Sequence, residues 1–238
     1  MPHLTLGAQT WGDPMLPPLL AMHGWLDNAG SFALLAPLLA TRFHVIAPDL
    51  PGHGHSDHLP PGATYHFADY VGTLLQVTDA LRLGRFTLLG HSLGAGVAAL
   101  LAATAPERIE RLLLIEGLGP LGDDGTHTLQ RWHTALLPKT PARRPLRSFG
   151  SIEQAIAARS TASGLRPDLA RPIVERGLRT VDGGWRWRSD PRLLQPSAAR
   201  LAESQVHALL RGIDAPSQLL LAQPGTPYLP AAMMRERA

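Results

Sequence analysis

One short stretch decides the fold, because it reads as a strand, a sharp turn and a helix in direct succession. The stretch is Phe86-Thr87-Leu88-Leu89-Gly90-His91-Ser92-Leu93-Gly94-Ala95-Gly96. Gly90 and Gly94 flank Ser92 where a Cβ would crowd the turn, so the Ser92 hydroxyl is expected to stand clear of the sheet. His91 should point away from Ser92, because neighbouring residues of a strand alternate sides. The stretch therefore predicts an exposed serine nucleophile.

A second apolar run ends in His23-Gly24-Trp25, and its ending bears on the same chemistry. In a hydrolase with such a serine, the loop after this strand supplies a backbone N–H that binds the developing oxyanion. By position the two donors are the amides of Trp25 and Leu93, the second at a helix N-terminus. His23 itself is interpreted as a structural, hydrogen-bonded histidine rather than as a base.

Short apolar runs alternate with longer segments of helical period, which is typical of a parallel sheet wound with crossover helices. Leu4–Trp11 alternates like an edge strand. The other expected strands are Pro18–Met22, His44–Pro48, Phe86–Gly90 and Arg111–Ile115, and the expected covering helices are Phe32–Ala40 and Phe67–Leu83. The predicted fold class is α/β, with a mostly parallel, doubly wound sheet.

The strand pattern stops after Glu116 for about ninety residues, and three helices are expected instead. These are Ser151–Thr161, Asp168–Arg179 and Glu203–Arg211, and a last strand, Ser217–Ala222, then returns to the sheet. We therefore expect a core made of residues 1–116 and 214–238, with a helical lid at residues 117–213. A helix should begin near Pro230, and the C-terminal strand that would follow it is expected to be missing.

A different reading comes from the glycines that follow the serine. Gly94-Ala95-Gly96-Val97-Ala98-Ala99 fits the Gly-x-Gly-x-x-Ala dinucleotide fingerprint, and Glu116 stands about 20 residues further on, where a ribose-binding acid is found. In that fingerprint the first glycine closes the strand, whereas here the predicted strand ends at Gly90. Dinucleotide binding therefore ranks third, behind a hydrolase and a non-catalytic binding protein.

Several motifs together resemble the α/β-hydrolase superfamily, and within it the serine hydrolase-like proteins. They are His23–Phe32, the glycine-rich loop Asp49–Asp57, Gly90–Gly94, Leu114–Pro120 and Trp187–Leu193. The resemblance implies hydrolysis of an ester or thioester of a small or medium apolar acyl group, through an acyl intermediate on Ser92. It implies a small-molecule substrate and no cofactor or metal. The alternative is a pseudoenzyme or ligand-binding protein of the same fold, since this fold hosts many functions.

The triad acid departs from the usual pattern of this superfamily, which places an aspartate after the strand that follows the lid. Residues 223–238 contain no aspartate and only Glu236. Some members carry the acid at the end of the strand after the nucleophile helix, and Glu116 closes that strand here. Glu116 is therefore the candidate acid. A strand cap or a partner for a lid arginine is an equally good interpretation of Glu116.

The catalytic histidine is also missing from its usual place after one further strand. The remaining histidines are assigned to loop, lid or surface positions, and none is a credible base: His3, His44, His53, His55, His58, His66, His127, His133 and His207. We expect either a shortened form of a longer hydrolase or a pseudoenzyme. Without the base, the chain as given should be nearly inactive, and Leu219–Leu221 should leave apolar surface at a sheet edge.

Composition removes several other classes of function. The chain has no cysteine, so disulfides, thiolate nucleophiles and zinc–thiolate sites are excluded. A net charge of +3, with arginines scattered along the sequence, argues against nucleic-acid binding. No window is long and apolar enough for a membrane span, and a cytoplasmic protein is expected. Four aromatic residues of the lid suggest an acyl pocket or the lid's own core: Trp132, Phe149, Trp185 and Trp187.

Overall fold

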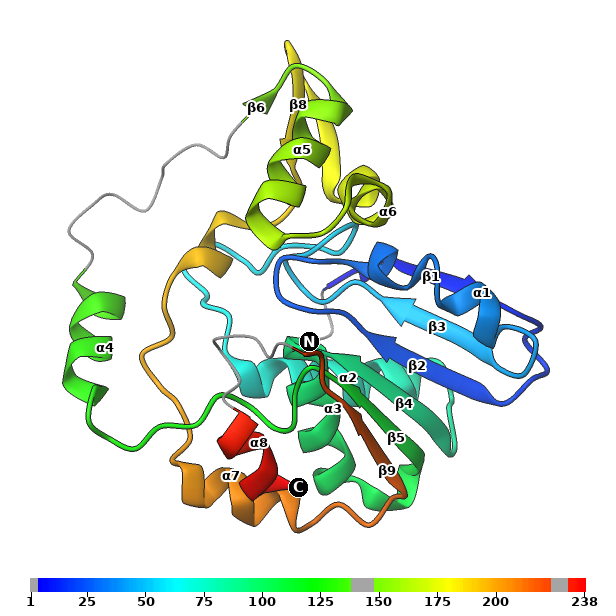
Figure 1. Cartoon of the computed structure of the whole chain (residues 1–238), viewed down its shortest axis with the longest axis vertical. Helices are drawn as coiled ribbons and strands as arrows, with labels where there is room; N and C mark the ends of the chain where they lie inside the picture. The colour runs from blue at the N-terminus through cyan, green and yellow to red at the C-terminus, as the bar shows by residue number, and fades with distance from the viewer. Residues whose placement is uncertain (1–3, 138–147, 224–230) are drawn as a thin grey trace.

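The computed structural model describes residues 4–137, 148–223 and 231–238 (Figure 1). The expected helix start at Pro230 lies outside these ranges, and the helix itself, α8, runs Ala231–Arg237. Among the described residues, no helix has the length and apolar character that crossing a membrane requires. The cytoplasmic location stays a prediction.

The main sheet has six strands within the described residues, in the order β1-β3-β2-β4-β5-β9. Their bounds are Ala8–Trp11, His44–Pro48, Pro18–Met22, Phe86–His91, Ile109–Ile115 and Ser217–Leu220, in the same order. Only β1 runs antiparallel to its neighbour, as the expected edge strand, and every other pairing is parallel. The carboxyl ends of β2, β4, β5 and β9 therefore meet at one edge of the sheet.

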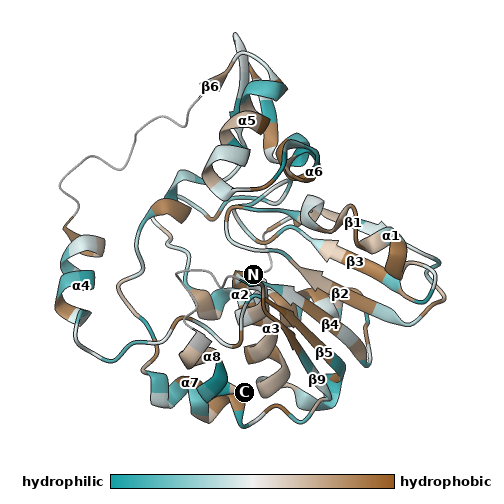
Figure 2. Cartoon of the chain, viewed as in Figure 1, coloured by the Kyte–Doolittle hydropathy of each residue, from teal (hydrophilic) through white to brown (hydrophobic). Residues whose placement is uncertain are grey.

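Helices cover the two faces of the sheet unequally. The larger core joins one face to α2 (Phe67–Ala80), α3 (Leu93–Thr104), α7 (Glu203–Leu210) and α8. The smaller core joins the other face to the 3₁₀ turn η1 (Ala29–Phe32) and to α1 (Ala36–Leu39). The strands that contribute to both cores are mostly hydrophobic, which is typical of parallel strands buried on both sides (Figure 2), although β5 has exposed Glu110 and Arg111 near its start.

Of the expected helix over Phe32–Ala40, only Ala36–Leu39 is α-helical, and Phe32 ends the preceding 3₁₀ turn η1. Asn28 caps η1, because its side chain accepts a hydrogen bond of 2.9 Å from the Gly30 N–H. Pro37 stands in the first turn of α1, where its missing N–H costs nothing. The helical period thus predicted a longer helix than the one that forms.

The expectation of a strand-free, helical lid was wrong. Between α4 (Thr128–Leu136) and α7, the chain forms α5 (Ile152–Ser163), α6 (Pro167–Gly177) and η3 (Pro191–Leu194), together with a three-stranded sheet. The strands are β6 (Ser148–Phe149), β7 (Leu178–Val181) and β8 (Gly184–Trp187). The expected helix over Asp168–Arg179 ends at Gly177, and an Asp182-Gly183 turn with a Gly183 φ of 77° joins β7 to β8. That dipeptide is a hairpin signal, and the sequence interpretation missed it.

Residues 148–187, called the small unit below, have a hydrophobic core of their own. Phe149 is buried there, and its ring meets that of Trp187 edge to face with centroids 5.4 Å apart. Trp185 packs against the same cluster, whereas Trp132 on α4 is 47% exposed. Three of the four lid aromatics therefore form the lid's own core.

Helix α7 packs on the main core, since Val206 and Leu210 are buried against it. The segment expected to be the lid thus contributes a helix to the core near its end. The domain boundaries at residues 116 and 213 stay predictions.

Candidate functional site

Ser92 lies at the apex of a strand–turn–helix junction. Strand β4 ends at His91 and α3 begins at Leu93, while Ser92 between them has φ 52° and ψ −114°. A positive φ is unusual for a residue with a Cβ, and it turns the Ser92 side chain out of the strand direction. The Ser92 N–H donates to the Ile115 carbonyl on β5 at 2.9 Å, and the residue is exposed. The expected sharp turn and exposed side chain are both present.

The two flanking glycines are required by close backbone approach. A Cβ on Gly90 would lie 2.4 Å from the Gly94 carbonyl oxygen, and a Cβ on Gly94 would lie 2.2 Å from the Met22 oxygen. Neither neighbour can move aside, because both are backbone atoms within the core. Gly96 meets the Gly119 oxygen in the same way at 2.9 Å. It lets α3 approach the loop after β5.

Two backbone amides beside the turn have no acceptor among the residues that the structure describes. Leu93 is the first residue of α3, so its N–H points out of the helix end. The Trp25 N–H lies in the loop after β2, the strand that pairs with β4. The Trp25 side chain is half exposed, and its Nε1 donates to the Leu193 carbonyl at 3.2 Å. This contact joins the loop after β2 to η3.

His23 is structural, as expected. Its Nδ1 donates to the Gly24 carbonyl at 2.7 Å, and its Nε2 accepts from the Leu50 N–H at 2.9 Å. Full burial, together with the nearby His53, lowers the pKa of His23 to about 3, so the ring is neutral. A Cβ on Gly24 would lie 3.2 Å from His91 Nδ1, so a side chain there would require His91 to shift. His91 therefore faces the loop after β2.

Glu116 follows β5 directly, one position beyond the residue that holds the Ser92 backbone. Its φ is 54°, so the two expected site residues both have left-handed backbones at neighbouring strand ends. The Glu116 N–H donates to the Leu220 carbonyl at 2.9 Å, and its carboxylate accepts a hydrogen bond from the Ala222 N–H. In the described residues, no lid arginine pairs with Glu116. The carboxylate thus bridges the ends of β5 and β9.

No histidine reaches the Ser92 hydroxyl among the residues that the structure describes. His23 and His53 are buried, and each forms a hydrogen bond with a backbone carbonyl. Burial lowers the pKa of His53 as well. His58 bonds the Arg188 carbonyl and lies 3.4 Å from Asp190. His3 lies outside the described residues. No group of three or more His, Asp or Glu side chains suited to a metal ion occurs in the described part either.

The sequence interpretation missed two buried ion pairs that hold the small unit onto the loops beside Ser92. Asp49, fully buried after β3, accepts from Arg176 Nε on α6 at 3.0 and 3.1 Å. The same carboxylate accepts from the Ala29 and His55 N–H groups, both at 2.7 Å. Asp27 pairs with Arg159 on α5. Both aspartates belong to the quoted motifs, but their partners follow no local pattern.

A third buried carboxylate, that of Asp190, gives the Trp187–Leu193 motif a structural role. Asp190 binds Arg192 at 2.6 Å and accepts from the Tyr65 hydroxyl at 2.8 Å. These contacts hold the pKa of Asp190 below its usual range, against the opposing effect of burial. The Asp190 N–H also donates to the Gly52 carbonyl at 2.9 Å. Residues of the separate sequence motifs therefore meet in the loops at the carboxyl edge of the sheet, where Ser92 also lies.

Residues 17–191 match the family described as alpha/beta hydrolase fold. The chain belongs to this family. The alternative of a dinucleotide-binding fold is thereby set aside, and Gly94 lies inside α3 rather than at the end of a strand.

Individual relatives agree with the family. A serine hydrolase-like protein of Danio rerio is 32% identical, over 92% of this chain and 69% of its own length. Hypothetical protein PA1622 from Pseudomonas aeruginosa PAO1 has a similar crystal structure, with a TM-score of 0.92 and 40% identity over 99% of this chain and 84% of that one. A thioesterase domain from the curacin biosynthetic pathway aligns with a TM-score of 0.84 and 25% identity, over 98% and 83%.

The chain spans only part of its curated relatives. The serine hydrolase-like protein DDB_G0286239 of Dictyostelium discoideum is 30% identical over 91% of this chain, but the match covers 63% of that protein. The α/β-hydrolase-fold assignment therefore rests on nearly the whole of this chain and on about two thirds of these relatives.

Proposed function

We propose that this chain is a serine hydrolase that acts on an ester or thioester of a small or medium apolar acyl group. The observation that carries the proposal is the Ser92 turn, which presents an exposed serine at positive φ at the start of α3. The free amides of Trp25 and Leu93 support it, since such donors are what an acyl-transfer site requires. The likeness to a thioesterase domain supports the thioester alternative.

In the proposed reaction, Ser92 Oγ attacks the carbonyl carbon of the substrate. The carbonyl oxygen becomes the oxyanion and accepts from the Trp25 and Leu93 N–H groups, while the serine proton passes to a base. The alcohol or thiol then leaves with a proton, and water hydrolyses the acyl–Ser92 ester. The half-exposed indole of Trp25 offers an apolar wall for the acyl group, a role that the buried Phe149 of the small unit cannot fill.

Glu116 is the proposed acid of this site, acting through a histidine rather than on the substrate. Its backbone lies one residue beyond Ile115, whose carbonyl holds the Ser92 N–H. The contact with the Ala222 N–H fixes the carboxylate at the carboxyl edge of the sheet, the edge at which Ser92 also lies.

A non-catalytic ligand-binding protein of the same fold is the second candidate. It is favoured by one observation, the lack of a histidine in contact with the Ser92 hydroxyl among the described residues. Loss of the histidine in a well-studied serine protease costs about 10⁶-fold in kcat. About 10³–10⁴-fold over water remains there from the oxyanion hole and binding. We therefore expect slow hydrolysis by this chain.

The two candidates are separated by hydrolysis of p-nitrophenyl butyrate, measured beside the Ser92→Ala variant with and without added imidazole. The hydrolase predicts a slow, Ser92-dependent rate, stimulated by imidazole above the effect on Ser92→Ala, and one butyryl group on Ser92 by mass spectrometry. Equal rates for the two proteins and no acylation would support the binding protein. Rapid Ser92-dependent turnover without imidazole would show that one of the dismissed histidines acts as the base.

A further inference from the structure

A cavity of about 570 Å³ lies at the edge of the main sheet opposite Ser92. Its lining comes from the amino ends of neighbouring parallel strands, with Pro18 of β2, Phe86 of β4 and Arg111 of β5 among the lining residues. Ser92 and Glu116 follow the other ends of β4 and β5. At about 3.3 Å per residue, the length of these strands separates the two sites by roughly 15–20 Å.

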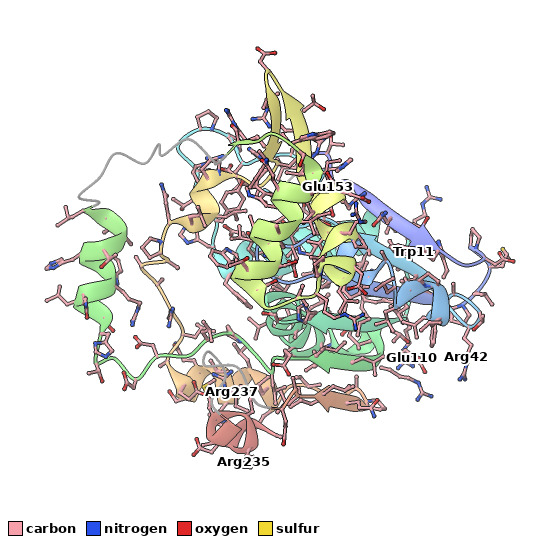
Figure 3. All side chains as sticks on the ribbon, turned by 45° about the horizontal axis from the view of Figure 1, so that its top comes forward. Trp11, Arg42, Glu110, Glu153, Arg235 and Arg237 are labelled. Carbon is pink, nitrogen blue, oxygen red and sulfur yellow. The ribbon has the colours of Figure 1, made fainter. Side chains whose placement is uncertain are left out.

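Positive charge gathers around this cavity. Arg42, Arg85 and Arg111 line it with one carboxylate, Glu110. Figure 3 shows Arg42 and Glu110 at the same edge of the molecule. Arg85 lies 3.4 Å from Glu110, whereas Arg42 and Arg111 form no ion pair with any described residue. Two guanidinium groups are therefore left without a counter-charge at one cavity.

The order of the strands accounts for this gathering. Arg42 comes just before β3, Arg85 just before β4, and Arg111 lies in β5 opposite Thr87. The amino ends of the parallel strands bring these residues to the same edge of the sheet, although they are far apart in sequence, and β2 and β4 lie between the strands of Arg42 and Arg111. Three arginines against one glutamate give the lining of the cavity a net positive charge, which favours an anion among the arginines.

Part of the wall of the cavity is apolar. Phe43 and Phe86 line it together with two prolines, Pro17 and Pro18, and the Phe86 side chain is buried at the floor. Ligand sites of this size usually combine such walls with a few charged groups that fix orientation. Guanidinium groups are well suited to phosphate and carboxylate oxygens, which they bind in pairs.

We propose that this amino-edge cavity is a binding site for an organic anion, namely a phosphate or carboxylate carried on a flat apolar group. The anion lies between Arg42 and Arg111, and the apolar group lies against Phe43 and the prolines. The site is separate from the Ser92 chemistry and does not depend on it. Because β4 and β5 connect the two edges, bound anion also stabilises the strands that carry Ser92 and Glu116.

The test uses phenyl phosphate as the probe, with binding measured by calorimetry and by backbone amide shifts. We expect saturable binding, with shifts centred on residues 42–43, 85–87 and 110–111. Arg42→Gln/Arg111→Gln should weaken binding by about tenfold or more, because it removes both free guanidinium groups. Ser92→Ala should bind like the wild type, so the result is independent of the proposed hydrolysis.

The matched control is Arg179→Gln/Arg211→Gln, which removes two exposed arginines far from the cavity in sequence and without ion pairs to described residues. This control should bind phenyl phosphate normally. Equal weakening in the two double variants would reduce the effect to net charge and overturn the proposal. So would the absence of binding to the wild type, or inorganic phosphate binding as tightly as phenyl phosphate, since the apolar walls would then contribute nothing. Circular dichroism confirms that each variant is folded.

Discussion

Arg176 on α6 and Asp49 after β3 form an ion pair, with Nη2 2.8 Å from Oδ2, where the small unit meets the main sheet. Asp49 is fully buried and also binds the Ala29 and His55 N–H groups. One carboxylate thus joins the loop after β2, the glycine-rich loop after β3 and the small unit. The geometry around Ser92 depends on this junction, because the loop after β2 carries the Trp25 amide.

Removing either partner should therefore destabilise the protein strongly. Arg176→Met leaves a buried carboxylate without its counter-ion, and we expect a loss of about 3–5 kcal/mol in the free energy of unfolding. Asp49→Asn/Arg176→Met should cost less than the sum of the two single variants. Arg171→Gln is the control on the same helix, since Arg171 pairs with Glu175 in solvent and its loss should cost about 0.5 kcal/mol or less. Urea unfolding measures the wild type, the two single variants of the pair, the double variant and Arg171→Gln. Equal losses of unfolding free energy for Arg171→Gln and Arg176→Met would contradict the role assigned to Arg176.

Two glycine-to-alanine substitutions should change the stability of the protein in opposite directions. Gly94→Ala places a Cβ 2.2 Å from the Met22 carbonyl oxygen, so it should cost several kcal/mol or prevent folding. Gly72→Ala, within α2, meets no atom within 4 Å and should stabilise the helix by up to about 1 kcal/mol. Thermal unfolding of both variants checks the pair. A Gly94→Ala protein as stable as the wild type would show that the turn at Ser92 is looser than described.

Burial of His23 predicts a loss of stability in mild acid. Its pKa is about 3 in the folded protein against 6.5 for a free histidine, so the unfolded chain takes up a proton first. The stability associated with neutral His23 is complete above pH 6.5 and falls as the pH drops from 6.5 towards 3. Between pH 7 and pH 5 we expect a loss on the order of 1–2 kcal/mol from this residue.

The measurement is urea unfolding of the wild type and His23→Gln at both pH values. His23→Gln should be less stable at pH 7, because two buried hydrogen bonds are weakened, but it should lose less between pH 7 and pH 5. The wild type should still lose some stability to His53, whose pKa burial also lowers. If both proteins respond equally to acid, the neutral state of His23 does not control the response.

The sequence predicted the sheet well because each parallel strand is a short apolar run closed by turn residues. It also located Ser92, since strand, glycines and helix are all local signals. It did not predict the small three-stranded sheet, whose strands are short and half exposed, so they carry neither a buried run nor a clean alternation. It also missed the pairing of Asp49 with Arg176, because an ion pair between residues 127 positions apart leaves no local pattern.

Arg237 should hold the terminal helix in place. Its side chain is buried and donates to the Leu118 and Pro120 carbonyls at 2.7 and 2.9 Å, while Nε lies 2.6 Å from Glu203. Arg237→Met leaves these carbonyls without their hydrogen-bond donor and should lower the free energy of unfolding by about 2–4 kcal/mol. Arg235→Met, on the same helix but exposed, should be nearly neutral. Chemical denaturation at neutral pH compares the two variants, and equal losses of stability would contradict this role of Arg237.

The same contact has a pH signature of its own. Arg237 holds the pKa of Glu203 below its usual value of 4.5, although partial burial opposes this shift. The stabilisation is therefore complete above pH 4.5 and is lost as the pH falls through the lowered value. Arg237→Met should remove this part of the acid sensitivity, whereas Arg235→Met should keep it. Repeating the denaturation series between pH 3 and pH 6 decides between the two outcomes.

The free edge of β9 should promote self-association. Strand β9 pairs with β5 on one side, and no described strand pairs with its other side. Leu220 and Leu221 are 50% and 42% exposed there, so apolar side chains lie beside unpaired backbone groups. Such an edge favours pairing with a second chain, which charged residues prevent. Leu221→Lys should therefore lower the self-associated fraction seen by sedimentation velocity. Leu38→Lys replaces a leucine of α1 that is 73% exposed but lies away from any strand edge, and it should leave the association unchanged. If the two lysine variants reduce association equally, general hydrophobicity and not the edge of β9 drives it.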